Sequence, residues 1–208
     1  MSSPAPFVYP ETPHRRKHDP AGYANYQDYK PWLRDEFTFR CVYCLEREMW
    51  YPDRAGSFSG DHVVAQKDDP SRVCDYTNLV YACTRCNCLK SRVRLLDPTA
   101  VQFGQHLRIE SDGMVHALSK EGEFLVRQLH LNKDPALAVR KYHLDVLALN
   151  QEFPEHAKVQ SLFLQSFCYP EELPNLVVLI PPAGNALEIN KYACFHTRRE
   201  KGLLEKVY

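Results

Sequence analysis

The chain has 208 residues, of which 26 are Lys or Arg and 26 are Asp or Glu, so its formal net charge is zero. A chain of this length can bury a substantial core as one domain, or carry a small motif with an extension. The balanced charge excludes a polycation, so any contact with nucleic acid must come from a local basic patch.

The N-terminal sequence MSSPAPFVYP lacks the basic segment and apolar run of a signal peptide. The chain also contains no apolar run of the roughly 18 residues that a membrane-spanning helix needs. We therefore expect a cytoplasmic location without contact to a membrane. In such a reducing compartment, clustered cysteines among the eight in the chain are expected to bind metal rather than to form disulfides.

Residues 1–36 are expected to form an N-terminal arm. This segment holds six prolines, which prevent a regular element early in the chain. We therefore expect an extended arm that is followed by a short helix near residues 23–34. A disordered tail is the alternative, but the regular spacing of three tyrosines favours docking of the arm on the rest of the protein.

Residues 37–96 are expected to form a small mixed domain, because short apolar runs alternate with turn signals there. Thr84 is a suitable N-cap for a helix, and the Asp97-Pro98 pair is a suitable end for it. The expected elements are, in order, a hairpin at 37–51 with Cys41 and Cys44 in its turn, strands at 58–64 and 79–82, and a helix from Thr84 to Asp97.

Residues 97–208 are expected to form a mixed, mainly helical extension that packs on the preceding domain, which alone is too small to bury enough apolar surface. The apolar stretch at 176–180 fits either a buried strand or a packing segment. The other expected elements are a β excursion at 99–118 with a turn at Asp112-Gly113, and helices at 124–131 and 135–153.

Two Cys-x-x-Cys pairs, Cys41/Cys44 and Cys83/Cys86, are separated by 38 residues. Two residues between thiolates allow both sulfurs of a tight turn to reach one ion, and two such turns complete a tetrahedral shell that suits zinc. Since four thiolates leave no open coordination position, we predict a structural zinc site. Simple apolar packing of the cysteines and a redox dithiol are the alternatives.

The segments GDHVVAQ and TNLVYACTRCNCLKS carry a second set of polar residues around these cysteines. Residues 37–96 resemble the HNH family of His-Me finger nucleases. The residues that carry the resemblance are Asp61-His62, Asn78, Asn87 and Lys90. The resemblance implies an α+β fold, in which a ββα-metal finger is stabilised by the four-cysteine zinc site. Asn87 stands where some members have His, which is the HNN variant of the motif.

The chemistry of phosphodiester hydrolysis fits the same residues. It needs a deprotonated water aligned with phosphorus and positive charge on the phosphate oxygens. His62 is the expected general base, with its other ring nitrogen donating to a backbone carbonyl in the loop held by Asn78. Asp61 and Asn87 offer the hard oxygen ligands that favour Mg²⁺ or Mn²⁺. For His62, a purely structural role is the alternative.

The expected helix of the finger is basic. Asn87, Lys90 and Arg94 have the i, i+3 and i+7 spacing that projects side chains from one side of a helix. Lys90 and Arg94 are therefore expected to contact phosphates that flank the cut. Arg85 and Arg92 add positive charge to the same segment, which has no acidic residue. A solvated charged helix is the alternative.

Together these features predict an endonuclease that hydrolyses DNA and binds it largely through phosphates. The zero net charge argues against strong DNA binding by the chain alone, so a protein partner that delivers or activates it is a second expectation. By analogy with the family, that complex is a prokaryotic anti-phage defence system. The alternative from another class is a non-catalytic zinc module that binds nucleic acid or a protein partner.

Overall fold

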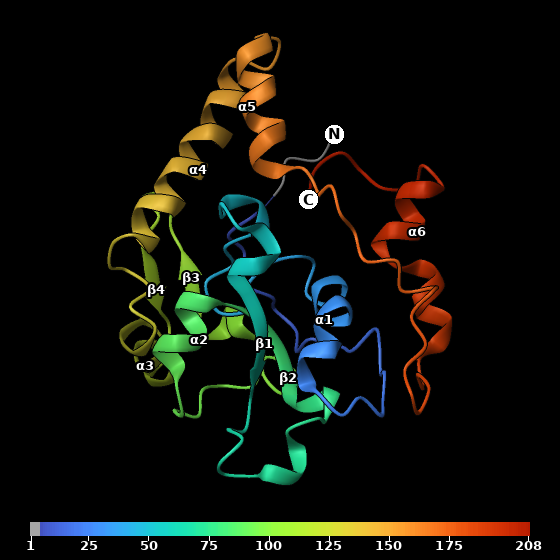
Figure 1. Cartoon of the computed structure of the whole chain (residues 1–208). Helices are drawn as coiled ribbons and strands as arrows, with labels where there is room; N and C mark the ends of the chain where they lie inside the picture. Colours follow the sequence, from blue (N-terminus) through green and yellow to red (C-terminus); the bar gives the residue numbers. More distant parts are fainter. Residues whose placement is uncertain (1–4) are drawn as a thin grey trace.

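In the computed structural model, which describes residues 5–208, an antiparallel strand pair and a short helix lie at the centre of the molecule (Figure 1). Strand β1 (Phe58–His62) pairs with β2 (Leu79–Cys83) from Phe58↔Cys83 to His62↔Leu79. Helix α2 (Thr84–Lys90) follows β2 directly. This ββα unit confirms the predicted α+β fold with its finger.

The N-terminal arm packs along the finger. Within the described part of the arm, η1 (Tyr26–Tyr29) and α1 (Lys30–Glu36) follow a segment without helix or strand. The Arg16 guanidinium donates to the backbone oxygen of Leu79 in β2 at 2.7 Å. Contacts of this kind agree with docking of the arm, and the part of the expected arm at 1–4 lies outside the described residues.

The first cysteine pair lies in a tight turn rather than in a regular hairpin. Arg40 and Arg47 form one isolated bridge where two strands were expected at 37–51. The turn is closed by a hydrogen bond from the Cys41 backbone nitrogen to the Glu46 backbone oxygen at 2.9 Å. Because the chain curls to bring two sulfurs to one point, it does not extend into a ladder. Two 3-10 helices, η2 (Glu48–Trp50) and η3 (Arg54–Ser57), then lead to β1.

Helix α2 is shorter than the sequence predicts. It ends at Lys90, and Ser91 has a positive φ of 51°, so the helix does not continue to Asp97. The Ser91 backbone nitrogen still donates to Asn87 O at 3.0 Å, which closes the last turn. Arg94 lies beyond this end, so the expectation that Arg94 shares a helix face with Asn87 is wrong. The apolar and charged pattern alone does not reveal a left-handed residue at this position.

The N-cap of α2 also differs from the expectation. Cys83 is the N-cap, and its Sγ accepts a hydrogen bond from the Cys86 backbone nitrogen at 3.4 Å. Thr84 is the first helical residue, and its hydroxyl donates to the backbone oxygen of Ser57 at 2.9 Å. The second cysteine pair therefore spans the start of the helix, and the Cys83 thiol caps it in place of the Thr84 hydroxyl that the sequence suggested.

The extension contains the expected β excursion and helices, with shifted bounds. A hairpin of β3 (Leu107–Ile109) and β4 (Val115–Ala117) turns at Gly113, whose φ of 81° suits glycine. Helices α4 (Ala136–Glu152) and α5 (Ala157–Phe167) form a hairpin that projects from the body (Figure 1). The remaining elements are η4 (Pro70–Arg72), η5 (Tyr76–Asn78), η6 (Phe103–Gln105), α3 (Lys120–Gln128), η7 (Glu188–Ala193) and α6 (Phe195–Glu200).

The apolar stretch at 176–180 does not form a strand. Leu176 is buried, whereas Val178 is 68% exposed and Ile180 is 85% exposed. Leu179 also packs, partly buried, against the core, so the stretch is anchored by Leu176 and Leu179 and leaves Val178 and Ile180 in solvent. Among the helices of the described residues, none is long and apolar enough to cross a membrane.

One hydrophobic core joins the arm, the finger and the extension. It includes Trp32 of α1, Phe58 and Tyr81 of the strand pair, and Leu125 and Leu131 of the extension, all nearly inaccessible to solvent. The expectation that the extension packs on the finger is confirmed. This shared core explains how so short a strand pair is held in a fixed position, because residues of the arm and the extension belong to the same core.

Candidate active site

The end of β1 and the helix α2 form two walls of a pocket of about 330 Å³ on the finger. The pocket contains three of the four residues expected to be catalytic, and Asn78, the last residue of η5, lies outside its lining. The lining residues include Tyr26, Gly60, Asp61, His62, Gln66, Asn87, Lys90 and Arg92.

His62 is held through one ring nitrogen. Its Nε2 lies 2.9 Å from the backbone oxygen of Val73, and because a carbonyl only accepts, Nε2 carries the hydrogen. In the neutral ring Nδ1 is then the acceptor, and the Gln66 side-chain amide lies 3.3 Å from it. The Tyr26 ring packs edge-on against the imidazole with centroids 4.7 Å apart. The imidazole is thus oriented with its basic nitrogen at the pocket.

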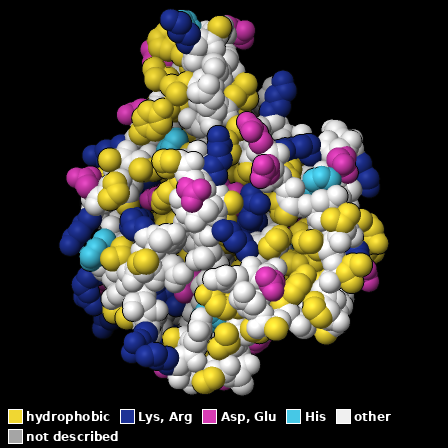
Figure 2. Space-filling model, viewed as in Figure 1, with side chains coloured by type: hydrophobic (Ala, Val, Ile, Leu, Met, Phe, Trp, Pro, Cys, Tyr) yellow, Lys and Arg dark blue, Asp and Glu magenta, His cyan; other side chains and the backbone are white. Residues whose placement is uncertain are grey.

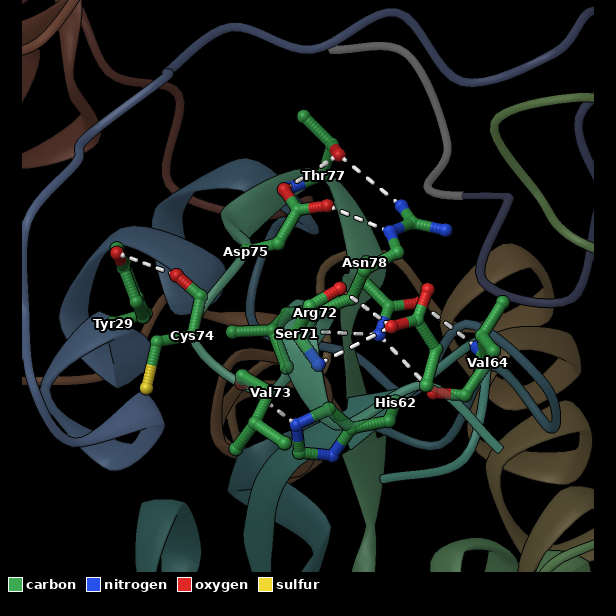
Figure 3. A network of polar contacts seen from close by, with 12 residues as sticks. Tyr29, His62, Val64, Ser71, Arg72, Val73, Cys74, Asp75, Thr77 and Asn78 are labelled. Atoms are coloured by element: carbon green, nitrogen blue, oxygen red, sulfur yellow. Dashed lines mark hydrogen bonds and ion pairs between the residues drawn. The ribbon is translucent and has the colours of Figure 1, made fainter. Parts of the chain in front are cut away.

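Asn78 fastens the loop that orients His62. Its Oδ1 accepts from the Val64 backbone nitrogen at 2.8 Å, and its Nδ2 donates to the backbone oxygens of Val64 and Arg72, each at 3.1 Å. Figure 3 shows Asn78 at the centre of this network, with the bond from His62 to Val73 beside it. The expected hydrogen bond from His62 to a carbonyl in the loop held by Asn78 is therefore present.

Asp61 is only 4% exposed, and each of its carboxylate oxygens has a donor. The Tyr43 hydroxyl donates to Oδ2 at 2.7 Å, and the Lys90 ammonium donates to Oδ1 at 3.1 Å. The same ammonium also donates to the His62 backbone oxygen at 2.6 Å. Burial raises the pKa of the Asp61 carboxyl, and the Lys90 charge acts in the opposite direction.

Asn87 is turned so that its amide oxygen is available. Its Nδ2 donates to Ser59 Oγ at 3.0 Å, and among the described residues no hydrogen bond is formed to its Oδ1. Asp61 and Asn87 line the same pocket, so they bring one carboxylate and one amide oxygen together. This set of hard donors fits Mg²⁺ or Mn²⁺ and leaves most coordination positions to water or substrate.

The four basic residues of this region have different surroundings. Lys90 is 1% exposed and lies on Asp61, and Arg92 lines the pocket. The Arg85 guanidinium donates to the Leu129 backbone oxygen and to Glu46 at 3.0 and 3.2 Å. Arg94 lines a separate hollow together with Lys120 and Phe124 of the extension. The structure therefore does not bring the four basic side chains together on one surface.

The four cysteines converge at one buried point. The Sγ atoms of Cys41, Cys44, Cys83 and Cys86 all lie within 4.8 Å of one another, and Cys44 and Cys83 are 3.7 Å apart. A tetrahedral zinc with Zn–S bonds of about 2.3 Å separates its sulfurs by about 3.8 Å. The geometry therefore fits zinc and is too wide for disulfides. The cluster positions these four residues for a zinc site, as the spacing predicts.

Sequence reasoning missed three residues of the site. Tyr43 contacts Asp61, and Tyr26 and Gln66 contact His62. Tyr26 belongs to the arm and Tyr43 to the first cysteine turn, so no spacing within the GDHVVAQ segment reveals them. Two signals were available: Tyr43 lies between two predicted zinc ligands, and Gln66 ends the GDHVVAQ segment, four residues after His62.

Comparison with known families gives one match. The family model described as HNH endonuclease matches residues 41–92. The matched region begins at Cys41 and ends at Arg92, so it spans both cysteine pairs and the whole pocket motif. No match was found among curated proteins or among solved structures. The resemblance of this region to the HNH family is therefore confirmed, with four cysteines positioned for zinc.

Proposed function

We propose that this protein is a metal-dependent endonuclease that hydrolyses phosphodiester bonds of DNA. The observation that carries the proposal is the fixed tautomer of His62, whose Nε2 donates to Val73 O while Nδ1 lies at a pocket shared with Asp61 and Asn87. A neutral histidine whose Nδ1 carries no hydrogen is suited to act as general base, once water takes the place of the Gln66 amide that lies 3.3 Å from it. The HNH match over the same residues supports this chemistry.

In the proposed reaction, His62 Nδ1 accepts a proton from the attacking water. Asn78 acts through the loop, since its Nδ2 donates to the backbone oxygen of Arg72, the residue before Val73, whose carbonyl fixes the imidazole. Asp61 and Asn87 supply oxygen ligands, and a Mg²⁺ or Mn²⁺ ion bound there would supply positive charge to the phosphate oxygens. Lys90 donates to the buried Asp61 carboxylate, and its charge opposes the rise that burial causes in the pKa of Asp61. We therefore assign Lys90 to holding Asp61 rather than to binding a phosphate.

DNA contacts are proposed to involve phosphates at the rim of the pocket. Arg92 and Lys67 line the pocket and are exposed or partly exposed, and Arg94 lies farther along the chain. Arg85 has internal partners, so its contribution to DNA binding is expected to be the smallest. Because the net charge is zero and few basic side chains line the pocket, the chain should bind DNA weakly, and its affinity for DNA should fall further with added salt.

The test is cleavage of supercoiled plasmid in Mg²⁺ or Mn²⁺ by the native chain and by His62→Ala. The matched control is His116→Ala, because His116 is exposed on β4, outside the pocket. We expect cleavage by the native chain and the control, and a loss of at least about 100-fold for His62→Ala. Equal cleavage by all three would refute the mechanism. Absence of cleavage by all three would favour the non-catalytic zinc module.

A protein partner in an anti-phage complex is a further part of the proposal, and it follows from the family analogy. It is supported by exposed aliphatic side chains at Val178, Ile180 and Ile189, the last being 79% exposed. Figure 2 shows hydrophobic side chains gathered over η7 and the segment before it. The role is tested by the plating efficiency of phage on cells that express the native protein with its neighbouring genes, or the His62→Ala variant in the same setting. Equal plating efficiency on the two kinds of cell would exclude the role.

A further inference from the structure

Tyr43 links the two metal sites of the finger. It lies inside the first cysteine turn, between Cys41 and Cys44, and its side chain is almost completely buried. Its hydroxyl donates to Asp61 Oδ2 at 2.7 Å, which is a normal, well-formed hydrogen bond. Its backbone oxygen accepts from the Tyr9 hydroxyl at 2.8 Å. One residue is therefore fixed by the zinc turn at its backbone and by the candidate catalytic carboxylate at its tip.

The Asp61 carboxylate is held from two directions. Lys90 reaches Oδ1 from the end of α2, and Tyr43 reaches Oδ2 from the cysteine turn. The backbone nitrogen of Val42 donates to Tyr81 O at 3.0 Å, so the turn is itself joined to β2. A phenol ring has two side-chain torsions and is packed on all sides here, so it transmits the position of the turn to the carboxylate with little freedom.

We propose that Tyr43 is a positioning residue that orients Asp61 toward the catalytic cation and thereby makes the zinc turn part of the catalytic metal site. This inference rests on the proposed function. Hydrogen bonds to a ligating carboxylate fix which oxygen faces the ion, and their loss typically lowers metal affinity about 10- to 100-fold. The cysteine cluster then does more than stabilise the finger, because it fixes the position of Tyr43, which contacts Asp61 of the catalytic metal site.

The experiment compares Tyr43→Phe with Tyr9→Phe. Both substitutions remove one buried hydroxyl next to the cysteine turn, but only the Tyr43 hydroxyl contacts Asp61. Binding of Mn²⁺ to the zinc-loaded chain is measured by electron paramagnetic resonance of the free ion, together with the Mg²⁺ concentration for half-maximal cleavage. We expect Tyr43→Phe to raise the Mn²⁺ dissociation constant and the half-maximal Mg²⁺ concentration about 10-fold or more. Its zinc content and thermal midpoint should stay close to those of Tyr9→Phe.

A merely structural role for Tyr43 would give a different pattern. It would lower the thermal midpoint or the zinc content and leave the Mn²⁺ dissociation constant of the folded fraction unchanged, which overturns the inference. If Tyr43→Phe does not fold, Tyr43→Met fills part of the same space without a hydroxyl and is judged by the same binding curve.

Failure of the proposed function is recognised separately by Asp61→Ala. If the native chain binds Mn²⁺ no better than Asp61→Ala, the catalytic metal site itself is wrong. If the native chain binds Mn²⁺ through Asp61 and Tyr43→Phe binds it equally well, only the role of Tyr43 is wrong.

Discussion

The cysteine cluster and the candidate catalytic pocket lie on one finger, yet they are built in opposite ways. The four thiols are completely buried, close to one another and without an open side. The pocket is open to solvent, and its polar residues are held by groups that lie behind them, such as Val73 and Asn78. A closed shell of ligands suits a structural ion, whereas an incomplete one suits chemistry. The comparison predicts that loss of a pocket residue removes activity and leaves the finger folded, whereas loss of a cysteine removes both.

The largest expected effect is from Cys83→Ser, which should destroy both regions. Cys83 is a zinc ligand candidate, the last residue of β2 and the N-cap of α2. Structural zinc contributes about 10 kcal/mol or more, which is comparable with the whole stability of a domain. Elemental analysis and a circular dichroism melt should show loss of zinc and of the folded state. Cys88→Ser, on an exposed residue of the same helix, should leave both unchanged; a stable, zinc-free Cys83→Ser protein would contradict the assignment.

Asp61→Ala should separate the two regions. We expect cleavage to fall about 1000-fold, because an ion at the phosphate is worth several kcal/mol and each 1.4 kcal/mol is a factor of ten. Zinc content should stay the same, since Asp61 contacts the cysteine turn only through Tyr43. Plasmid cleavage and elemental analysis measure the two quantities, with the exposed Asp112→Ala as control. Joint loss of zinc and activity would show that the sites are not separable.

Asn78→Ala should loosen the loop that orients His62. It removes three hydrogen bonds that fasten the loop, at about 2–4 kcal/mol of unfolding free energy. The loop that presents Val73 O to His62 should then be less fixed, which should lower cleavage about 100-fold. Urea unfolding and plasmid cleavage measure these effects, with Asn190→Ala in η7 as control. If stability falls but the cleavage rate of the folded protein does not, the orientation of His62 does not depend on this loop.

The smallest effect concerns the extension and pH. Burial, with the nearby Arg47 charge, lowers the pKa of His143 to about 3, and its ring stacks on Trp50 at 3.8 Å. The unfolded chain takes up this proton near pH 6.5, so stability is lost as pH falls from about 6.5 toward 3. Between pH 7 and 5, His143→Phe should lose about 2 kcal/mol less unfolding free energy than the native chain. The control is His116→Phe, on an exposed histidine, which should lose as much unfolding free energy between pH 7 and 5 as the native chain. The same loss in His143→Phe would contradict the burial argument.

Local patterns predicted the finger well. The two strands appeared at residues 58–62 and 79–83, close to expectation, because alternating apolar residues and turn signals act over a few positions. The four cysteines were also predicted, since two residues between thiols nearly fix the geometry of a zinc turn. The hydrogen bond of His62 to the loop was predicted from chemistry, because a base needs a defined tautomer.

Other features were outside the reach of local patterns. The end of α2 depends on a left-handed Ser91, which separated Arg94 from the catalytic pocket. Lys90 has the spacing of a phosphate contact, but the fold buries it against Asp61. Whether a charged side chain faces solvent or a carboxylate depends on what packs above it, which spacing along one helix does not contain.

The sequence by itself determined the finger, the four-thiol cluster and the identity of the candidate base, because each rests on contacts between residues near in sequence or on the valence of the ligands. Only the tertiary structure decided how these parts are connected. Tyr43 meets Asp61, the arm places Tyr26 on His62, and one core joins the finger to the extension. Such contacts join distant segments, and they are selected by the packing of the whole core rather than by any local pattern.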